Sequence, residues 1–182
     1  MHNKETAIAV KAPTLAFWGV RSIIMQSLLI VAAAALPAIA HLTGAPVRII
    51  LPMHWPVILA GLVFGWRGGA LVGVLAPFAS YLISGMPLPG IIPAMTVELG
   101  VYGLIAGLMR EKFALNSFAS VALAVIAGRL CFALTVLATV NAESSFGAYF
   151  QAALIPGIPA AIAQIIVLPI LAGLWLKNAQ GK

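Results

Sequence analysis

Aspartate is absent from this sequence of 182 residues, and charged side chains of any kind are scarce. Charged residues make up 8% of the chain and apolar residues 63%, and the only acids are Glu5, Glu98, Glu111 and Glu143. A soluble domain carries roughly 25% charged residues. The composition therefore excludes an ordinary soluble protein, and it predicts an all-α integral membrane protein in which residues 1–182 form a single membrane domain.

The residue patterns of metal sites and of common catalytic sites are also missing. The three histidines and the single cysteine, Cys131, lie far apart, without the spacing of metal ligands. No Asp-rich magnesium site and no GxxxxGK[ST] phosphate loop occurs, so we expect no ATP hydrolysis by this chain. We therefore expect no enzymatic activity, no cofactor and no metal. The net charge of +6 fits membrane topology better than nucleic-acid binding.

Six apolar segments predict six transmembrane helices. Pro and Gly clusters separate them, and they cover about residues 22–42, 50–65, 69–84, 91–109, 117–140 and 152–176. Lys and Arg are retained on the cytoplasmic side of a membrane. With the N-terminus inside, eight basic residues are cytoplasmic, only Arg48 is outside, and Arg129 lies within a span. We therefore expect both termini to be cytoplasmic, in a multi-pass protein of the cytoplasmic (inner) membrane.

Two ionisable side chains within the predicted spans indicate a functional site. Glu98 lies about seven residues into the fourth span, and Arg129 lies about eleven residues before the outer end of the fifth. At 1.5 Å per residue their depths are about 10 and 16 Å, close enough for the side chains to meet. Gln164 joins this layer if its helix begins after the break at residues 156–159. The pair is either purely structural or also lines an outward-facing pocket, and we favour the pocket.

The outer end of the second span is expected to be irregular, and the span itself short. Pro52 and Pro56 keep this entry barely helical, which presents His54 and Trp55 near the outer rim. Irregular backbone at this depth is tolerated where it lines a cavity. An interfacial anchor is the alternative role for Trp55, and solvation at the interface is the alternative for His54.

Small residues recur at four-residue spacing in several spans. Examples are Gly61 with Gly65 and Gly103 with Gly107. In lipid, such spacing lets two helices approach closely and associate by van der Waals contact. We expect most of these residues to pack helices within the bundle.

The residues from Leu51 to Met109 closely resemble a known family. They read LPMHWPVILAGLVFGWRGGALVGVLAPFASYLISGMPLPGIIPAMTVELGVYGLIAGLM. This run combines an M-H-x-P-V-x-x-A-G stretch, a G-x-x-x-G-x-x-x-P segment, a G-M-P loop and an E-L-x-x-Y-G helix. It is similar to the substrate-binding S components of energy-coupling factor (ECF) vitamin transporters. The segment from Gly157 to Pro169 resembles the last helix of that family, so the resemblance spans roughly residues 20–176.

The resemblance implies a high-affinity binding subunit for a vitamin or cofactor precursor. Such S components associate with a transmembrane T component that carries two ATP-binding cassette subunits, and they contact it through an A-x-x-x-A surface on the first helix. Ala34 and Ala38 match that surface. Family pockets use outer loops and the outer halves of the last three helices, which implies as site residues Arg48, His54, Trp55, Met86, Glu98, Tyr102, Arg129 and Gln164.

The residue types suggest roles within such a pocket. Arg48, His54 and Arg129 could hold a carboxylate or phosphate, while Glu98 could accept a hydrogen bond from a hydroxyl or amine. Aromatic rings such as that of Tyr102 could cover apolar atoms of the ligand. The alternative is a stand-alone secondary transporter or channel with Glu98 as the coupling group. The absence of a clear inverted repeat argues against that alternative.

Overall fold

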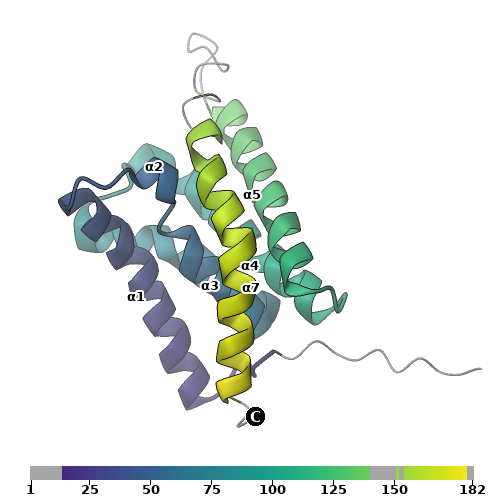
Figure 1. Ribbon diagram of the computed structural model, residues 1–182. Helices are drawn as coiled ribbons and strands as arrows, with labels where there is room; N and C mark the ends of the chain where they lie inside the picture. Colours follow the sequence, from purple (N-terminus) through teal and green to yellow (C-terminus); the bar gives the residue numbers. More distant parts are fainter. Residues whose placement is uncertain (1–13, 140–150, 152–153, 180–182) are drawn as a thin grey trace, which may run out of the picture.

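A computed structural model describes residues 14–139, 151 and 154–179. Every regular element in this part of the chain is helical (Figure 1). The elements are α1 (Val20–Leu42), α2 (Val47–Ile50), α3 (His54–Ser84), η1 (Pro89–Ile91), α4 (Ile92–Glu111), α5 (Ser117–Thr139), η2 (Ile155–Gly157) and α7 (Ile158–Ala179). The structure thereby confirms the all-α class that the sequence predicts.

Five helical segments are long and apolar enough to cross a membrane. They are Val20–Leu42, Val47–Ser84, Pro89–Glu111, Ser117–Ala138 and Ile155–Ala179. The fourth of the predicted connections, Arg110 to Lys112, falls at the end of α4 as expected. The connection expected between Asn141 and Gly147 lies outside the described residues, as do both chain ends.

The second and third predicted spans share helix α3, which breaks at Gly65. This residue has φ 74° and ψ −172°, far from helical values. In a continuous helix, residues 61 and 69 would be about 12 Å apart along the axis. Here a Cβ built on Gly69 would lie 2.7 Å from the Cα of Gly61. The chain therefore folds back at Gly65 into a first arm, residues 54–64, and a second arm, residues 66–84.

The position of this turn corrects one sequence-based expectation. Trp66, Arg67 and Gly68 were expected to form the connection, but they are already helical. The reason is that Gly65 turns the chain in a single residue with a positive φ, which side chains disfavour. The Trp66 N–H donates to Glu111 Oε2 at 3.3 Å, so the carboxylate caps the start of the second arm. A Cβ on Gly65 would overlap this same oxygen.

Glycines let α4 pack directly against both arms of α3. A Cβ on Gly103 would overlap the backbone of Gly69, and a Cβ on Gly61 would meet the carbonyl oxygen of Gly103. A Cβ on Gly107 would overlap the backbone of Gly65 and of the residue after it. The prediction that four-residue spacing of small residues serves packing within the bundle is confirmed at this interface.

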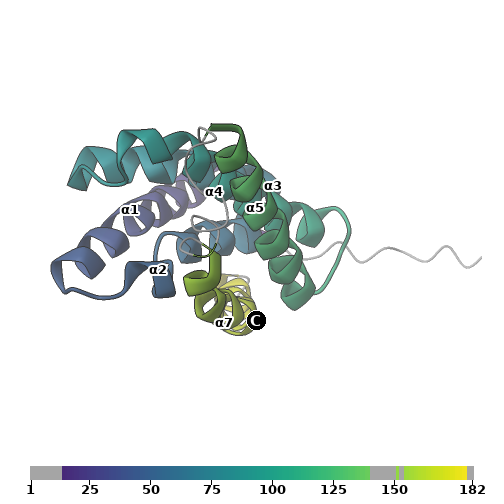
Figure 2. The same cartoon turned by 90° about the horizontal axis from the view of Figure 1, so that it is seen from above.

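The remaining helices surround this pair. Helix α1 packs on α3, α5 packs on α4, and α7 contacts both α3 and α5. Seen from above, α1 and α5 lie on opposite sides of the molecule (Figure 2). The short elements α2, η1 and η2 gather at one end, which we call the α2 end, and the Gly65 turn lies at the other. The core combines buried residues of α1, α3, α4, α5 and α7.

Candidate functional site

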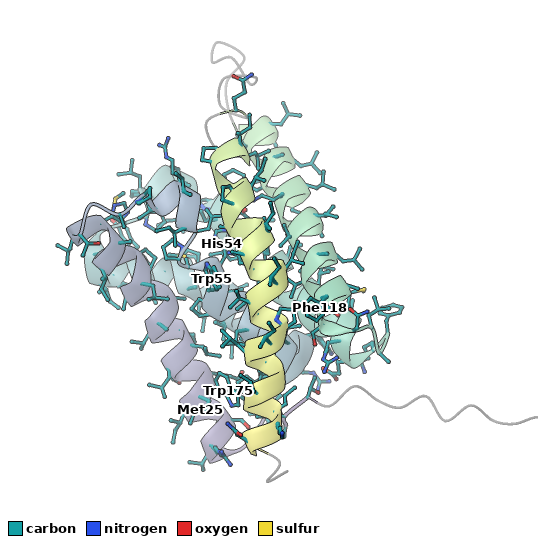
Figure 3. The ribbon with its side chains drawn as sticks, viewed as in Figure 1. Met25, His54, Trp55, Phe118 and Trp175 are labelled. Atoms are coloured by element: carbon teal, nitrogen blue, oxygen red, sulfur yellow. The ribbon has the colours of Figure 1, made fainter. Side chains whose placement is uncertain are left out.

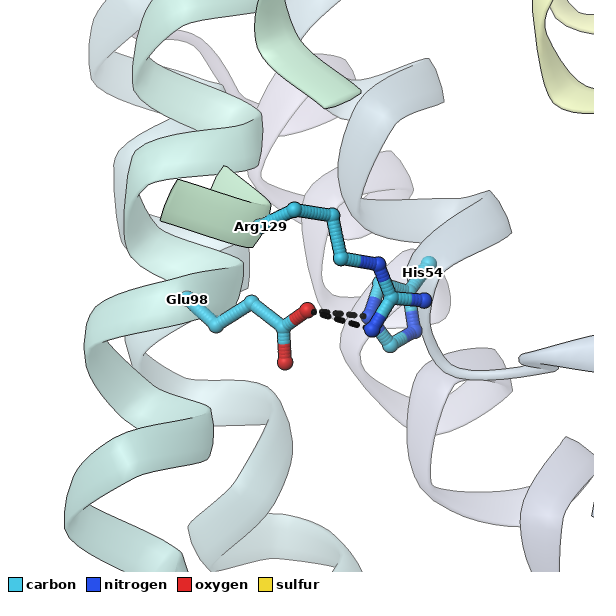
Figure 4. Close-up of polar contacts among 3 residues, drawn as sticks. All are labelled: His54, Glu98 and Arg129. Atoms are coloured by element: carbon cyan, nitrogen blue, oxygen red, sulfur yellow. Dashed lines mark ion pairs between the residues drawn. The ribbon is translucent and has the colours of Figure 1, made fainter. Parts of the chain in front are cut away.

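Three charged or titratable side chains meet inside the bundle, and we call them the ionic cluster. Glu98 Oε1 lies 3.1 Å from an Arg129 guanidinium nitrogen and 3.4 Å from His54 Nε2 (Figure 4). Glu98 is 2% exposed and His54 is 4% exposed. The Arg129–Glu98 pair confirms that these residues share one depth, as the sequence predicts.

Three separate elements bring the cluster together. Glu98 lies on α4 and Arg129 on α5, while His54 is the first residue of α3. Leu51 precedes it in a left-handed conformation, with φ 48° and ψ 56°. This turn ends α2 and confirms the irregular entry that the prolines predict. The first arm of α3 is short because it begins only after this turn.

Tyr102 closes the cluster from one side. Its ring contacts the His54 ring edge to face, with centroids 5.0 Å apart and planes at 89°. The side chain is completely buried, and it interacts electrostatically with Glu98 and Arg129. The ring has room because residue 128 of α5 is a glycine; a Cβ at that position would overlap the ring. The aromatic ring thus fixes the plane of the His54 imidazole.

A cavity of about 290 Å³ lies at the α2 end, and we call it the first cavity. Of the eight predicted site residues, Arg48, His54 and Met86 line it. The other lining residues are Pro37, His41, Val47, Leu51, Pro52, Met53, Ser80, Pro87 and Met95. Its walls are therefore mostly apolar, with a few nitrogen and oxygen groups among them.

The polar groups of the first cavity are unevenly placed. Arg48 is exposed, whereas His54 and Ser80 are buried. The cavity thus has an open rim at Arg48 and a closed floor at His54 and Ser80. No acid is among the described lining residues. Such a cavity suits a small molecule that carries an apolar body and a negatively charged group.

A second cavity of about 400 Å³ lies between α5 and the start of α7. Arg129 lines it, and the other lining side chains are apolar. A Cβ on Gly157 would overlap the Arg129 guanidinium, so only glycine leaves the side chain room to pass. The ionic cluster consequently lies between the two cavities. His54 lines the first cavity, Arg129 lines the second, and Glu98 contacts these two side chains.

Trp55 and Gln164, also predicted site residues, occupy other positions. The Trp55 indole N–H donates to the Ile50 carbonyl at 2.9 Å, which ties α2 to the start of α3. Figure 3 shows Trp55 next to His54, near the middle of the bundle. Gln164 on α7 is completely buried, and its amide atoms have no hydrogen-bond partner among the described residues. The described linings of the two cavities include neither residue, nor Glu98 or Tyr102.

The two alanines expected to dock a partner differ in exposure. Ala34 is completely buried within the chain, whereas Ala38 is half-buried. Pro37, between them, lines the first cavity. In this conformation only Ala38 offers surface to a partner helix.

Sequence reasoning missed Ser80 and His41 as cavity residues. Nothing in their local sequence marks them, since Ser80 lies in an apolar helix and His41 at a helix end. The described residues contain no group of three or more His, Cys, Asp or Glu side chains that could hold a metal ion.

Comparison with known proteins identifies the family. The family model for the ECF transporter, substrate-specific component, matches residues 21–174, which is most of the chain. No curated protein and no solved structure matches the sequence. The matched region includes the ionic cluster and all the residues that line the first cavity. The chain therefore belongs to the family of ECF transporter substrate-specific components, the substrate-binding subunits of multi-pass membrane transporters.

Proposed function

We propose that this chain binds a vitamin or cofactor precursor for uptake, with the first cavity as its binding site. The observation that carries this proposal is a cavity of about 290 Å³ formed by three of the predicted site residues, Arg48, His54 and Met86. Its size is at the lower end of the range for small-molecule pockets. We place these three residues in contact with the substrate, and Glu98, Tyr102 and Arg129 in the role of holding His54.

The charges around the first cavity favour an anionic substrate. The Arg48 guanidinium lies at the rim without an ion-pair partner in the described part of the chain. A guanidinium presents paired N–H donors that match a carboxylate or phosphate. His41 is a further nitrogen-bearing side chain in the same lining, beside Arg48 and His54. The apolar remainder would cover the body of the substrate.

The proposed topology has six membrane crossings and both termini in the cytoplasm. The reversal at Gly65 supports it, because α2 with the first arm of α3 can make one crossing and the second arm the next. Basic residues at the Gly65 end, such as Arg67 and Lys112, support a cytoplasmic location for that end. The first cavity then opens to the outside, where a substrate for uptake is encountered.

Transport by this chain is proposed to need a T component and two ATP-binding cassette subunits. The sequence has no phosphate loop of its own, and this fits a division of labour in which partner subunits hydrolyse ATP. Ala38 is the proposed docking contact, since its small side chain is accessible on α1. A stand-alone transporter with Glu98 as the coupling group is less well supported, because Arg129 and His54 both hold that carboxylate.

The decisive experiment identifies the bound molecule and then removes one contact. Mass spectrometry of the purified protein should reveal a small organic anion, whose affinity is then measured by calorimetry. Arg48→Gln should weaken binding about tenfold or more without lowering thermal stability, since charged hydrogen bonds contribute about 1.5–3 kcal/mol. Arg67→Gln, an exposed residue at the Gly65 end, is the matched control. Unchanged affinity in Arg48→Gln would exclude the first cavity as the binding site.

A further inference from the structure

Two buried polar side chains at the floor of the first cavity lack hydrogen-bond partners. Ser80 is 1% exposed and His54 is 4% exposed, and both line the cavity. Neither Ser80 Oγ nor either ring nitrogen of His54 has a hydrogen-bond partner among the described residues, although Nε2 lies 3.4 Å from Glu98 Oε1. A buried polar group without a partner costs about 1–3 kcal/mol. Two such groups on one cavity are therefore best explained by a ligand that satisfies them.

The Ser80 hydroxyl differs from five other Ser and Thr hydroxyls of the bundle. A hydroxyl on a helix usually donates to the backbone carbonyl four residues earlier. The structure shows this bond at Thr43, Ser84, Thr96, Ser120 and Thr135, with distances of 2.8–2.9 Å. Ser80 makes no such bond. Its hydroxyl is thus left available to both donate to and accept from a molecule in the cavity.

The ionic cluster determines what His54 can offer. Glu98 Oε1 lies 3.1 Å from Arg129 and 3.4 Å from His54 Nε2, so the carboxylate lies on the Nε2 side of the ring and leaves Nδ1 on the other side. Arg129 already balances the charge of Glu98, and a second cation at this buried position would have no counter-charge among the described residues. An imidazole that carries its proton on the nitrogen facing Glu98 presents a lone pair at Nδ1.

The floor of the first cavity, in that tautomer, offers an acceptor beside a hydroxyl. A carboxylate placed there would face the Nδ1 lone pair, while the guanidinium of Arg48 lies at the rim. A substrate hydroxyl or amide N–H, in contrast, can donate to Nδ1 and bond with Ser80. The charged end of a substrate therefore belongs at the rim and a neutral polar end at the floor.

We infer that Ser80 is a specificity-determining residue that, together with His54, binds a neutral hydroxyl or amide group of the substrate. Arg48 binds the anionic group at the opposite end. The substrate class is thus an elongated monoanion with an apolar middle and a neutral hydrogen-bonding group far from its charge. This inference rests on the proposed function of the first cavity as the binding site.

Matched probes and matched serine variants test the inference. The probes are 6-hydroxyhexanoate and hexanoate, which differ only in the terminal hydroxyl, and their affinities are measured by calorimetry on the purified full chain. The wild type should prefer the hydroxylated probe threefold to tenfold, as expected for a neutral hydrogen bond. Ser80→Ala should bind hexanoate normally and lose most of this preference. Its thermal stability should not fall, because no hydrogen bond within the chain is removed.

Ser120→Ala is the control, because Ser120 is equally buried but its hydroxyl already donates to the Asn116 carbonyl. It should keep the preference for the hydroxylated probe. Equal affinity of the wild type for the two probes, or a preference that survives in Ser80→Ala, overturns the inference. Failure of both probes to bind also overturns the inference. If the co-purified molecule still binds, and binds more weakly to Arg48→Gln, the proposed function of the first cavity stands even though the inference fails.

Discussion

Neutralising Glu98 and Arg129 together separates a structural role of the ionic cluster from direct contact with the substrate. The two side chains are 3.1 Å apart, and the side chains of Glu98 and Arg129 are 3% and 16% exposed. At an effective dielectric constant of about 20, unit charges at this distance attract by about 5 kcal/mol. Removing one partner of a buried pair typically costs about 3–5 kcal/mol, because the other charge is left uncompensated.

The single variants Glu98→Gln and Arg129→Gln should each lower the free energy of unfolding by about 3–5 kcal/mol. The double variant should recover most of this loss, because neither charge remains and the side-chain volumes are similar. Glutamine at position 98 still offers an oxygen to His54 Nε2, so the substrate affinity of the double variant should stay within about threefold of wild type. The measurements are thermal melting in detergent and calorimetry with the molecule identified by mass spectrometry.

Two results would refute this reasoning in different ways. A double variant as unstable as either single variant would show that the losses do not arise from an uncompensated charge. A stable double variant that binds its substrate ten times more weakly or worse would show that Glu98 or Arg129 contacts the substrate. In that case the two residues would line the binding pocket, as their depth in the sequence suggests.

The remaining predictions concern the turn, the topology and the partner. Gly65→Ala should lower the free energy of unfolding by at least about 1–2 kcal/mol, because φ is positive there, while Gly90→Ala, with open space around it, should melt like wild type. In a background without the native cysteine, a cysteine at Ser84 should react with an impermeant thiol reagent from outside and one at Asn116 should not; the reverse pattern would invert the proposed orientation. Ala38→Trp should bind substrate normally but no longer co-purify with the T component, and normal co-purification would place the docking surface elsewhere.

Depth along a helix is the feature of the site that the sequence predicts well. Helical rise converts residue number directly into depth, so the meeting of Glu98 and Arg129 followed from two counts along the chain. The irregular entry before His54 followed from its flanking prolines, which cannot continue a helix freely. Both inferences use properties of the local backbone, and the structure confirms both.

Some contacts could not be predicted in this way, because they depend on where the chain reverses direction and on which face each helix turns toward the bundle. Ser80 reaches the cavity of His54 only because the chain folds back at Gly65, and the position of that turn depends on Glu111 from another helix. The burial of Ala34 likewise depends on which face of α1 turns toward the bundle. A helix that is apolar on every face, as α1 is, does not specify in its sequence which face turns toward the bundle, since no polar face marks the outside.

The ionic cluster is better understood through the side chain it orients than through the stability it adds. A buried ion pair seldom stabilises a fold more than apolar residues of the same size would. The geometry instead constrains His54: Glu98 lies against Nε2, Tyr102 packs on the ring, and Arg129 balances the carboxylate. The remaining polar atom of the ring, Nδ1, belongs to a side chain that lines the first cavity. Charges within the bundle thus fix the orientation of the His54 ring, and this arrangement leaves the anionic part of a substrate to the exposed arginine at the rim.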